Sequence, residues 1–348
     1  MKTRVRPFRT SILLLFLLSW SSIVSQAQVN SQDSTVAFIA YWNLGDKYYF
    51  DHKATEYRIT GTDTVRTDHD TERFSLEVID STSHSYLLEY RCLAETHFTQ
   101  DSLENQLLEK LQKELSQDIA IRIQTDEFGS IQKITNLKEI RSLLDKVAKK
   151  TKKLLLREIK QQAKAQGSGL PDKEALAFLD GMMSVIFNAY TSEQGILASM
   201  SYLTRLFDYH GAALRLDSTY TSSYFTPSPF GADKDSIPTR TYVSCEMVNE
   251  DSLYVQCYCS NEYDTEKLVN SLIESFNQNS DSEHQIPHEP EAPVFYMEDY
   301  YNQVIHVGAG WTTELYSRRT TVNKDTRIIK EYSVDMVFPD DETPSGDS

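Results

Sequence analysis

Apolar and polar side chains alternate along the first third of the chain. Phe74, Leu76 and Val78 are apolar and separated by polar residues, and the same alternation returns between Tyr86 and Cys92. A period of two residues places the apolar side chains on one face of a half-buried strand. Four strands are predicted, with polar or glycine-containing breaks between them: Val36–Trp42, Lys47–Thr60, Arg73–Ile79 and Ser85–Phe98. Breaks this short favour antiparallel pairing.

In the middle of the chain the apolar residues recur every three or four positions, which predicts helices. Four helices are expected: one that begins at Asp101, one from Asn136 to about Gln166, then Asp172–Tyr190 and Ile196–Tyr209. A hairpin of strands Ile119–Thr125 and Ile131–Thr135 separates the first two helices. Gly129 is available for a positive φ in its turn.

The last third of the chain returns to the strand pattern. Strands are predicted at Leu214–Phe225, Thr241–Val248, Leu253–Ser260, Val294–Val307, Trp311–Val322 and Arg327–Phe338, with a helix at Thr265–Phe276 and a polar loop at Asn277–Pro293. Strands at both ends with helices between them predict an α+β fold. In this fold a curved antiparallel sheet from the N- and C-terminal strands packs on a helical middle segment, and residues 28–338 form a single domain.

Residues 1–27 have the order of a secretory signal peptide. A basic head precedes the apolar stretch Ile12–Trp20, and Ser25 and Ala27 stand at positions −3 and −1 of a cleavable bond before Gln28. This stretch is too short to span a bilayer, and no later stretch is long enough. We therefore expect an exported protein, periplasmic or extracellular, with no transmembrane segment after cleavage. The acidic residues 339–348 are expected to form a disordered tail.

The charge of the chain limits its partners. The leader holds four basic and no acidic residues, so its removal changes the net charge from −16 to −20. A surface this acidic repels nucleic acid, and no nucleic-acid partner is expected. The predicted helix from Asn136 is the exception, because it carries many basic residues, including Lys146, Lys149 and Lys153. This face either binds an anionic partner or is simply solvated, and both interpretations stay open.

Four cysteines are present: Cys92, Cys245, Cys257 and Cys259. Cys245 and Cys257 lie on two predicted strands joined by a short loop, which would set them face to face and close enough to bridge. The alternatives are a soft-metal pair formed by Cys257 and Cys259, or buried free thiols. The sequence leaves the pairing open.

Common catalytic and phosphate-binding motifs are missing from the sequence. His284 and His288 form the densest ligand-type cluster, but Pro287 disfavours the helix that would align both rings. We interpret this stretch as a solvated loop and Asp68-His69-Asp70 as a polar turn. His210 follows a predicted helix, where it would interact with the negative end of the helix dipole. The sequence thus predicts no catalytic residue, no metal ligand and no cofactor.

Several short motifs make the chain resemble uncharacterised exported proteins of Bacteroidota. They are a leader that ends in Ala27-Gln28, the segment Trp42–Tyr48, a paired-strand segment that ends in Ser85–Tyr90, and Gly308–Trp311. The resemblance implies export and assigns no activity or site residue. A helix-filled, curved sheet is also similar to the half-barrel of periplasmic lipoprotein carriers, which is an analogy of fold alone.

Two hypotheses of function follow from these observations. The first is a non-enzymatic, envelope-associated module that binds a small apolar ligand or an envelope component. The alternative is an exported hydrolase whose active-site residues meet only in the fold. A smooth apolar cavity would favour the binding module, whereas ionisable side chains clustered in a cleft would favour the enzyme.

Overall fold

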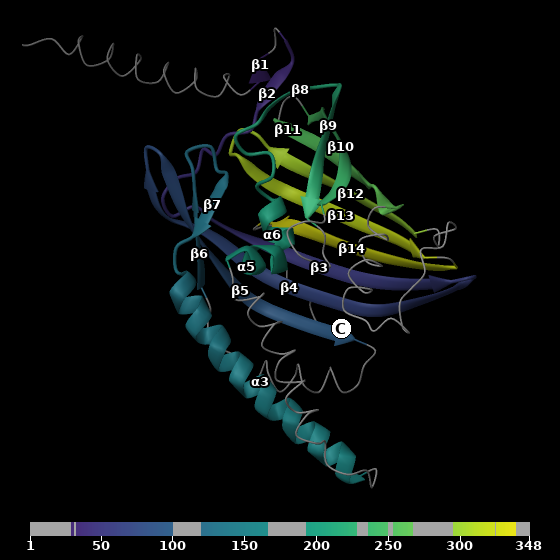
Figure 1. The fold of residues 1–348 in the computed structure, drawn as a ribbon. Coiled ribbons are helices and arrows are strands. Elements are labelled where there is room, and N and C mark those ends of the chain that lie inside the picture. The colour runs from purple at the N-terminus through teal and green to yellow at the C-terminus, as the bar shows by residue number, and fades with distance from the viewer. Residues whose placement is uncertain are drawn as a thin grey trace, which may run out of the picture.

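One large antiparallel sheet dominates the structure, a computed structural model (Figure 1). The structure describes residues 29–30, 33–99, 120–165, 193–227, 236–249, 253–266, 295–323 and 325–338. The sheet has eleven strands in the order β7-β6-β5-β4-β3-β14-β13-β12-β11-β10-β9. It curves around two short helices, α5 (Glu193–Ser199) and α6 (Ser201–Arg205), which lie on its concave side (Figure 1).

The strands of the large sheet are β3 (Lys47–Thr60), β4 (Asp63–Thr82), β5 (Ser85–Thr99), β6 (Ala120–Thr125), β7 (Ile131–Ile134), β9 (Ser218–Pro227), β10 (Ser236–Asn249), β11 (Tyr254–Tyr263), β12 (Phe295–His306), β13 (Trp311–Asn323) and β14 (Thr326–Val337). A small sheet joins β1 (Val29–Asn30), β2 (Thr35–Ala37) and β8 (Ala213–Arg215). The first and last thirds of the chain meet where β3 pairs with β14 along twelve residue pairs. This pairing makes one continuous sheet from strands that lie far apart in the sequence.

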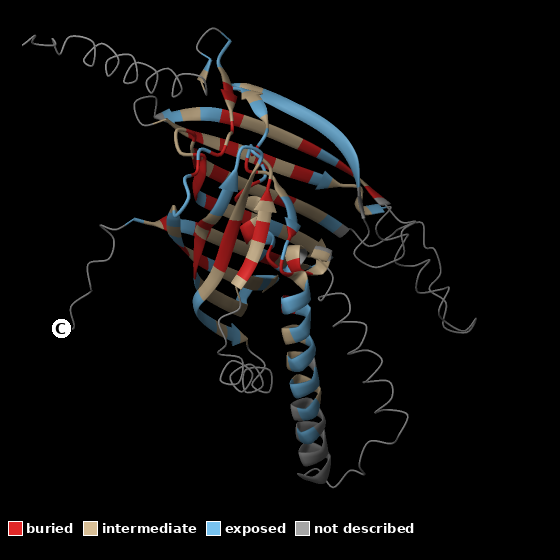
Figure 2. Ribbon diagram, turned by 90° about the vertical axis from the view of Figure 1, so that its left-hand side faces the viewer, coloured by how far each residue is buried: buried red, intermediate tan, exposed pale blue. Residues whose placement is uncertain are grey.

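The predicted α+β class is wrong, because the described fold is mostly β. No helical layer packs along the sheet in the described part of the chain. The long helix α3 (Leu137–Ala165) is anchored by its first turns, where Ile140 is buried and Leu144 packs against the core. Its remaining described side chains are exposed or half-buried, and the helix runs away from the sheet (Figure 2). The sheet instead closes its core with α5, α6 and its own side chains.

Most of the predicted strands and turns are confirmed. β3 has the predicted bounds, and β6 and β7 form the predicted hairpin, with Gly129 at a φ of 99°. The predicted strand Val36–Trp42 is shorter, because pairing in the small sheet ends at Ala37. The predicted helix Ile196–Tyr209 is broken into α5 and α6. The leader, the tail, the loop Asn277–Pro293, the helices predicted from Asp101 and at Asp172–Tyr190, and most of Thr265–Phe276 lie outside the described residues.

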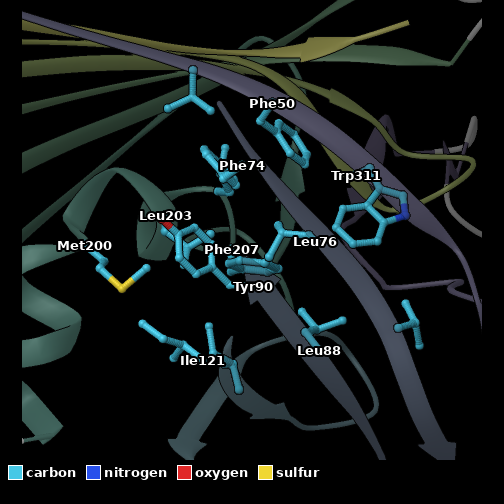
Figure 3. Packing of buried hydrophobic residues seen from close by; sticks show 14 of the residues in the cluster. Phe50, Phe74, Leu76, Leu88, Tyr90, Ile121, Met200, Leu203, Phe207 and Trp311 are labelled. Atoms are coloured by element: carbon cyan, nitrogen blue, oxygen red, sulfur yellow. The ribbon is translucent and has the colours of Figure 1, made fainter. Parts of the chain in front are cut away.

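The main hydrophobic core lies between the concave face of the sheet and the two short helices (Figure 3). Phe74 and Leu76 of β4 are fully buried, as the alternating pattern predicts, and they pack with Leu203 of α6. The rings of Phe50 and Phe74 stack with centroids 5.2 Å apart. A second cluster lies beneath the small sheet and includes the disulfide between Cys245 and Cys257.

Three of the motifs that carry the resemblance contribute residues to the main core: Trp42–Tyr48, Ser85–Tyr90 and Gly308–Trp311. The leader lies outside the described residues. Trp42 Nε1 donates a hydrogen bond to the Gly310 carbonyl over 3.0 Å, and its ring stacks on Trp311 with centroids 4.5 Å apart. Tyr48 packs on the same Trp311 ring, with centroids 4.9 Å apart. These residues therefore join the segment before β3 to the β12–β13 hairpin and have a structural role.

Candidate functional site

A row of charged side chains crosses the concave face beside the hydrophobic core. Asp68 of β4 lies opposite Glu56 of β3, which lies opposite Lys330 of β14. Lys330 in turn lies opposite Arg319 of β13, and Arg319 lies opposite Asp299 of β12. Side chains directly opposite one another in antiparallel strands share a face of the sheet. We call these five residues, from five adjacent strands, the charged row.

The charged row lines a pocket of about 450 Å³. The other lining residues include Asp70 and Tyr332 from the sheet, and Ser201 and Arg205 from α6. The volume lies in the range of small-molecule sites, which is about 300–1,000 Å³. The pocket is thus formed by the sheet on one side and by α6 on the other, at the edge of the main core.

The order of charges along the row opposes sheet stability. Asp68 and Glu56 are like charges directly opposite each other, and so are Lys330 and Arg319; such pairs destabilise a sheet. Two ion pairs offset the cost. Lys330 Nζ lies 2.8 Å from Glu56 Oε2, and Arg319 donates to both oxygens of Asp299 over 2.6 Å each. Like charges directly opposite each other reduce the stability of a sheet. Where they lie at a pocket, they are typical of residues that serve binding.

Asp299 is the buried anchor of the row. Its side chain is 3% exposed, and Tyr263 Oη also donates to it over 2.6 Å. Burial opposes ionisation, but the hydrogen bonds and charge of Arg319, the hydrogen bond from Tyr263 and the charge of Arg205 together outweigh it and lower the pKa of Asp299. Asp299 is therefore a fixed negative charge that orients Arg319.

Arg205 enters the pocket from the last turn of α6. The sheet holds this turn in place, because Gln303 Nε2 donates to the Arg205 carbonyl and Thr312 Oγ1 donates to the Leu206 carbonyl, each over 2.7 Å. The guanidinium stacks over the ring of Tyr301 at 4.3 Å. Its Nη1 is buried and has no hydrogen-bond partner among the described residues. A buried, unpaired donor of a permanent cation is costly, and an anionic ligand group would satisfy it.

A second polar cluster connects the charged row to the core. The carboxylate of Glu72 accepts hydrogen bonds from Tyr90 Oη and, over 2.6 Å, from Tyr202 Oη. The ring of His52 stacks on Tyr202 with centroids 4.1 Å apart. His52 Nδ1 lies 3.9 Å from Glu72 Oε2, yet burial lowers the pKa of His52 to about 4. The imidazole is therefore neutral at pH 7.

We expect His52 to make the protein acid-sensitive. Its pKa in the folded state, about 4, lies below the ordinary histidine value of 6.5, so the unfolded chain binds the proton more tightly. The stabilisation is complete above pH 6.5 and is lost as the pH falls toward 4. Between pH 7 and pH 5 the loss due to His52 is about 2 kcal/mol. Urea unfolding at both pH values should show a smaller loss for His52→Gln, and an equal loss in both proteins would contradict the assignment.

The structure corrects two predictions for site residues. Asp68-His69-Asp70 is part of strand β4 and not a turn, and Asp68 and Asp70 face the pocket while His69 faces away and contacts Thr55. His210 does not act as a charge at a helix end. It is buried, burial lowers its pKa, and its Nε2 donates to the Gly310 carbonyl over 2.9 Å.

The remaining predictions concern the cysteines, the second histidine cluster and the basic helix. Cys245 lies opposite Cys257 in the β10–β11 pairing and forms a disulfide with it, while Cys92 and Cys259 are free. This excludes the soft-metal pair. His284 and His288 lie outside the described residues. On α3, Lys146, Lys149 and Lys153 are exposed, which fits both interpretations of the basic face.

Sequence reasoning missed Arg205 and the charged row. A signal was present in β4, where the period of two that buries Phe74 and Leu76 continues backward through Glu72, Asp70 and Asp68. The alternation predicts that these three positions face the interior, where charged residues are rare. Charged residues at such positions indicate a functional site next to the core. Arg205 carried no such signal, because its position depends on how α6 packs.

Comparisons with known proteins do not assign this chain to a family. No protein-family model matches the chain, and no curated protein matches it. A structure entitled "Lipid-protein interactions in lipovitellin" aligns at 8% identity with a TM-score of 0.37, covering 85% of this chain and 25% of that one. OmpTdeltaL8, an outer membrane protein of Vibrio cholerae, aligns at 8% identity with a TM-score of 0.18, covering 85% of this chain and 100% of that one. At these TM-scores neither likeness supports an inference about function.

The helices in the described part of the chain do not include a membrane-spanning helix. None of them is both long enough and apolar enough to cross a bilayer. The amphipathic helix α3 is the longest, and its described surface is rich in lysine.

Proposed function

We propose that this protein is an exported, envelope-associated binding protein that holds a small anionic ligand in the pocket of the charged row. The observation that carries the proposal is Arg205, a permanent cation in the pocket wall whose buried Nη1 has no partner among the described residues. Arg319 and Lys330 add positive charge to the same pocket. The ligand is expected to place a carboxylate or phosphate group against Arg205.

The charged lining of the pocket changes the kind of ligand that we expect. The binding hypothesis from the sequence assumed a smooth apolar cavity, and the pocket is instead lined by charged side chains. We therefore propose a polar ligand in place of an apolar one. Tyr332, and Tyr301 beneath Arg205, still offer ring surface for an apolar part of the ligand.

The hydrolase hypothesis is supported by one specific observation. Asp68, Asp70 and His97 cluster at one end of the pocket, and burial raises the pKa of Asp70 despite the opposing effect of His97. Clustered ionisable groups of this kind favour an enzyme. We rank binding first because four of the five residues in the row are already held in ion pairs, which suits fixed charge recognition better than proton transfer.

Native mass spectrometry of the chain purified from its own host tests the proposal. We expect a mature N-terminus at Gln28, as the leader predicts, and a co-purified anionic compound. Calorimetric titration with citrate and with inorganic phosphate then measures anion binding directly. Arg205→Met should weaken binding by about 10–100-fold, because a hydrogen bond to a charged group contributes about 1.5–3 kcal/mol.

Two variants serve as matched controls. Arg205→Lys keeps the charge and should retain part of the affinity. Arg318→Met removes the neighbouring arginine on β13, whose side chain pairs with Glu331 and lines a different pocket together with Tyr300, so it should bind like the natural chain. A protein that is recovered empty and gives no heat with either anion, or an Arg205→Met variant that binds normally, contradicts the proposal.

A further inference from the structure

The imidazole of His97 lies between two carboxylates at the acidic end of the pocket. His97 of β5 is directly opposite Asp70 of β4, and Asp68 lies two residues earlier on the same face. His97 Nδ1 forms a hydrogen bond with Asp70 Oδ1, and His97 Nε2 lies 3.8 Å from Asp68 Oδ1. One ligand-type atom from each of the three residues falls within 4.8 Å of the others. The three side chains thus form a compact cluster of one nitrogen and two oxygen ligands.

The hydrogen bonding of His97 leaves one nitrogen facing the centre of the cluster. A carboxylate accepts hydrogen bonds, so Nδ1 is the donor to Asp70. In the neutral imidazole the lone pair then lies on Nε2, which is buried and has no hydrogen-bond partner among the described residues. This lone pair faces Asp68 Oδ1, which is also an acceptor. Two acceptors that face each other across 3.8 Å repel each other unless a cation lies between them, either a proton on Nε2 or a metal ion.

The basic residues of the row do not supply that charge. Lys330 pairs with Glu56, and Arg319 pairs with Asp299 at the far end. Asp68 and Asp70 each form an ion pair with His97 itself. The acidic end therefore has two carboxylates around a single imidazole.

We propose that Asp68, Asp70 and His97 form a binding site for a divalent transition-metal ion of the zinc type. His97 Nε2 and a carboxylate oxygen of Asp68 are the direct ligands. Asp70 accepts the hydrogen bond from His97 Nδ1, an arrangement that fixes the ring and increases its basicity at many zinc sites. Nitrogen and carboxylate ligands together select zinc over magnesium or calcium, which prefer oxygen alone.

The site opens into the pocket. Asp68 and Asp70 both line it, so the remaining coordination positions of the ion face the space that the proposed ligand occupies. With two direct protein ligands, His97 and Asp68, the ion keeps open positions for water or for an exchangeable group of the ligand. The inference goes beyond the binding of an anion by Arg205. The two sites share one pocket, but the proposed metal ligands, His97 and Asp68, differ from the basic residues Arg205, Arg319 and Lys330 that are proposed to bind the anion.

Calorimetric titration of the full, untagged chain with ZnCl2 tests the site. We expect one ion per chain with a Kd in the micromolar range or below. His97→Gln and Asp68→Asn each remove a direct ligand and should raise the Kd at least about 100-fold. Asp70→Asn removes the partner of the ring and should raise it about 10–100-fold. Calcium should bind at least about 100-fold more weakly than zinc, because imidazole is a poor ligand for calcium.

Matched controls separate this site from other histidines. His69→Gln changes the neighbouring histidine, which faces away from the pocket, and the pair His284→Gln and His288→Gln removes the other histidine cluster of the sequence. Both should leave the affinity unchanged, and so should Arg205→Met, which weakens anion binding alone. Circular dichroism checks that each variant is folded. If His97→Gln does not fold, the zinc affinity of Asp68→Asn provides the test. The absence of saturable zinc binding, tighter binding of calcium, or a normal Kd for His97→Gln would overturn the proposal.

Discussion

Trp42→Ala should lower the free energy of unfolding by about 3–5 kcal/mol, the usual cost of truncating a large buried aromatic side chain. Trp42 is 4% exposed. Its ring contacts four others, with centroids at 4.5 Å for Trp311, 5.1 Å for Tyr86, 5.4 Å for His210 and 5.9 Å for Phe207. The variant would leave a cavity among rings from three separate parts of the chain and would remove the hydrogen bond to the Gly310 carbonyl.

Urea unfolding followed by circular dichroism measures this loss, with Tyr41→Ala as the matched control. Tyr41 is the preceding residue and is 36% exposed, so its truncation should change the free energy of unfolding by about 0.5 kcal/mol or less. Trp42→Phe should fall between the two, because it keeps most of the ring contacts and loses the hydrogen bond. Equal effects of Trp42→Ala and Tyr41→Ala would show that the contacts of Trp42 with the β12–β13 hairpin do not stabilise the fold.

Local features of the fold could be predicted because they depend on neighbouring residues. The alternation in β4 and β5 reports which side chains are buried, and the position of Gly129 reports a turn that needs a positive φ. The same holds for the β10–β11 hairpin, where the short loop brings Cys245 opposite Cys257. Each prediction needed at most about a dozen residues of sequence, and each is confirmed.

The fold class could not be predicted, because it depends on what the long helix packs against. The apolar stripe of α3 predicted a layer on the sheet, and hydrophobic spacing alone does not say which surface a stripe meets. In the structure the sheet fills its concave face with residues such as Phe50 and Phe74, and with Leu203 of α6. The buried area that α3 was expected to cover is already occupied by side chains of the sheet and of α6.

The candidate site depends on register across five strands. Glu56 and Asp68 are 12 residues apart in the sequence, whereas Asp68 and Asp299 are more than 200 apart, and all stand in one row. Shifting one strand by one residue would move its charge to the opposite face. The sequence shows the charged residues, but the register that joins them depends on the long-range pairing of β3 with β14.

Gly310→Ala is the second substitution for which a large loss is expected, about 2–5 kcal/mol of the free energy of unfolding. Two costs add at this position. Gly310 has a φ of +69°, a conformation that costs an alanine about 1–2 kcal/mol. A Cβ atom would also lie 2.3 Å from the Ile39 carbonyl oxygen and 2.8 Å from the Ala40 Cα, so backbone must move, at a typical cost of about 1–3 kcal/mol. The displaced carbonyl of Gly310 is the acceptor for both Trp42 and His210.

Gly61→Ala separates the two costs. Gly61 has a similar φ of +60°, and a Cβ atom there would meet nothing within 4 Å, so this variant reports the conformational cost alone, about 1–2 kcal/mol. Urea unfolding of both variants under the same conditions gives the steric cost at Gly310 by difference. Near-ultraviolet circular dichroism should also change for Gly310→Ala alone, because the stacked rings of Trp42 and Trp311 lie beside the displaced carbonyl. If both variants lose the same free energy, the close approach of the β12–β13 hairpin to Ile39 adds no steric cost at Gly310, which contradicts this prediction.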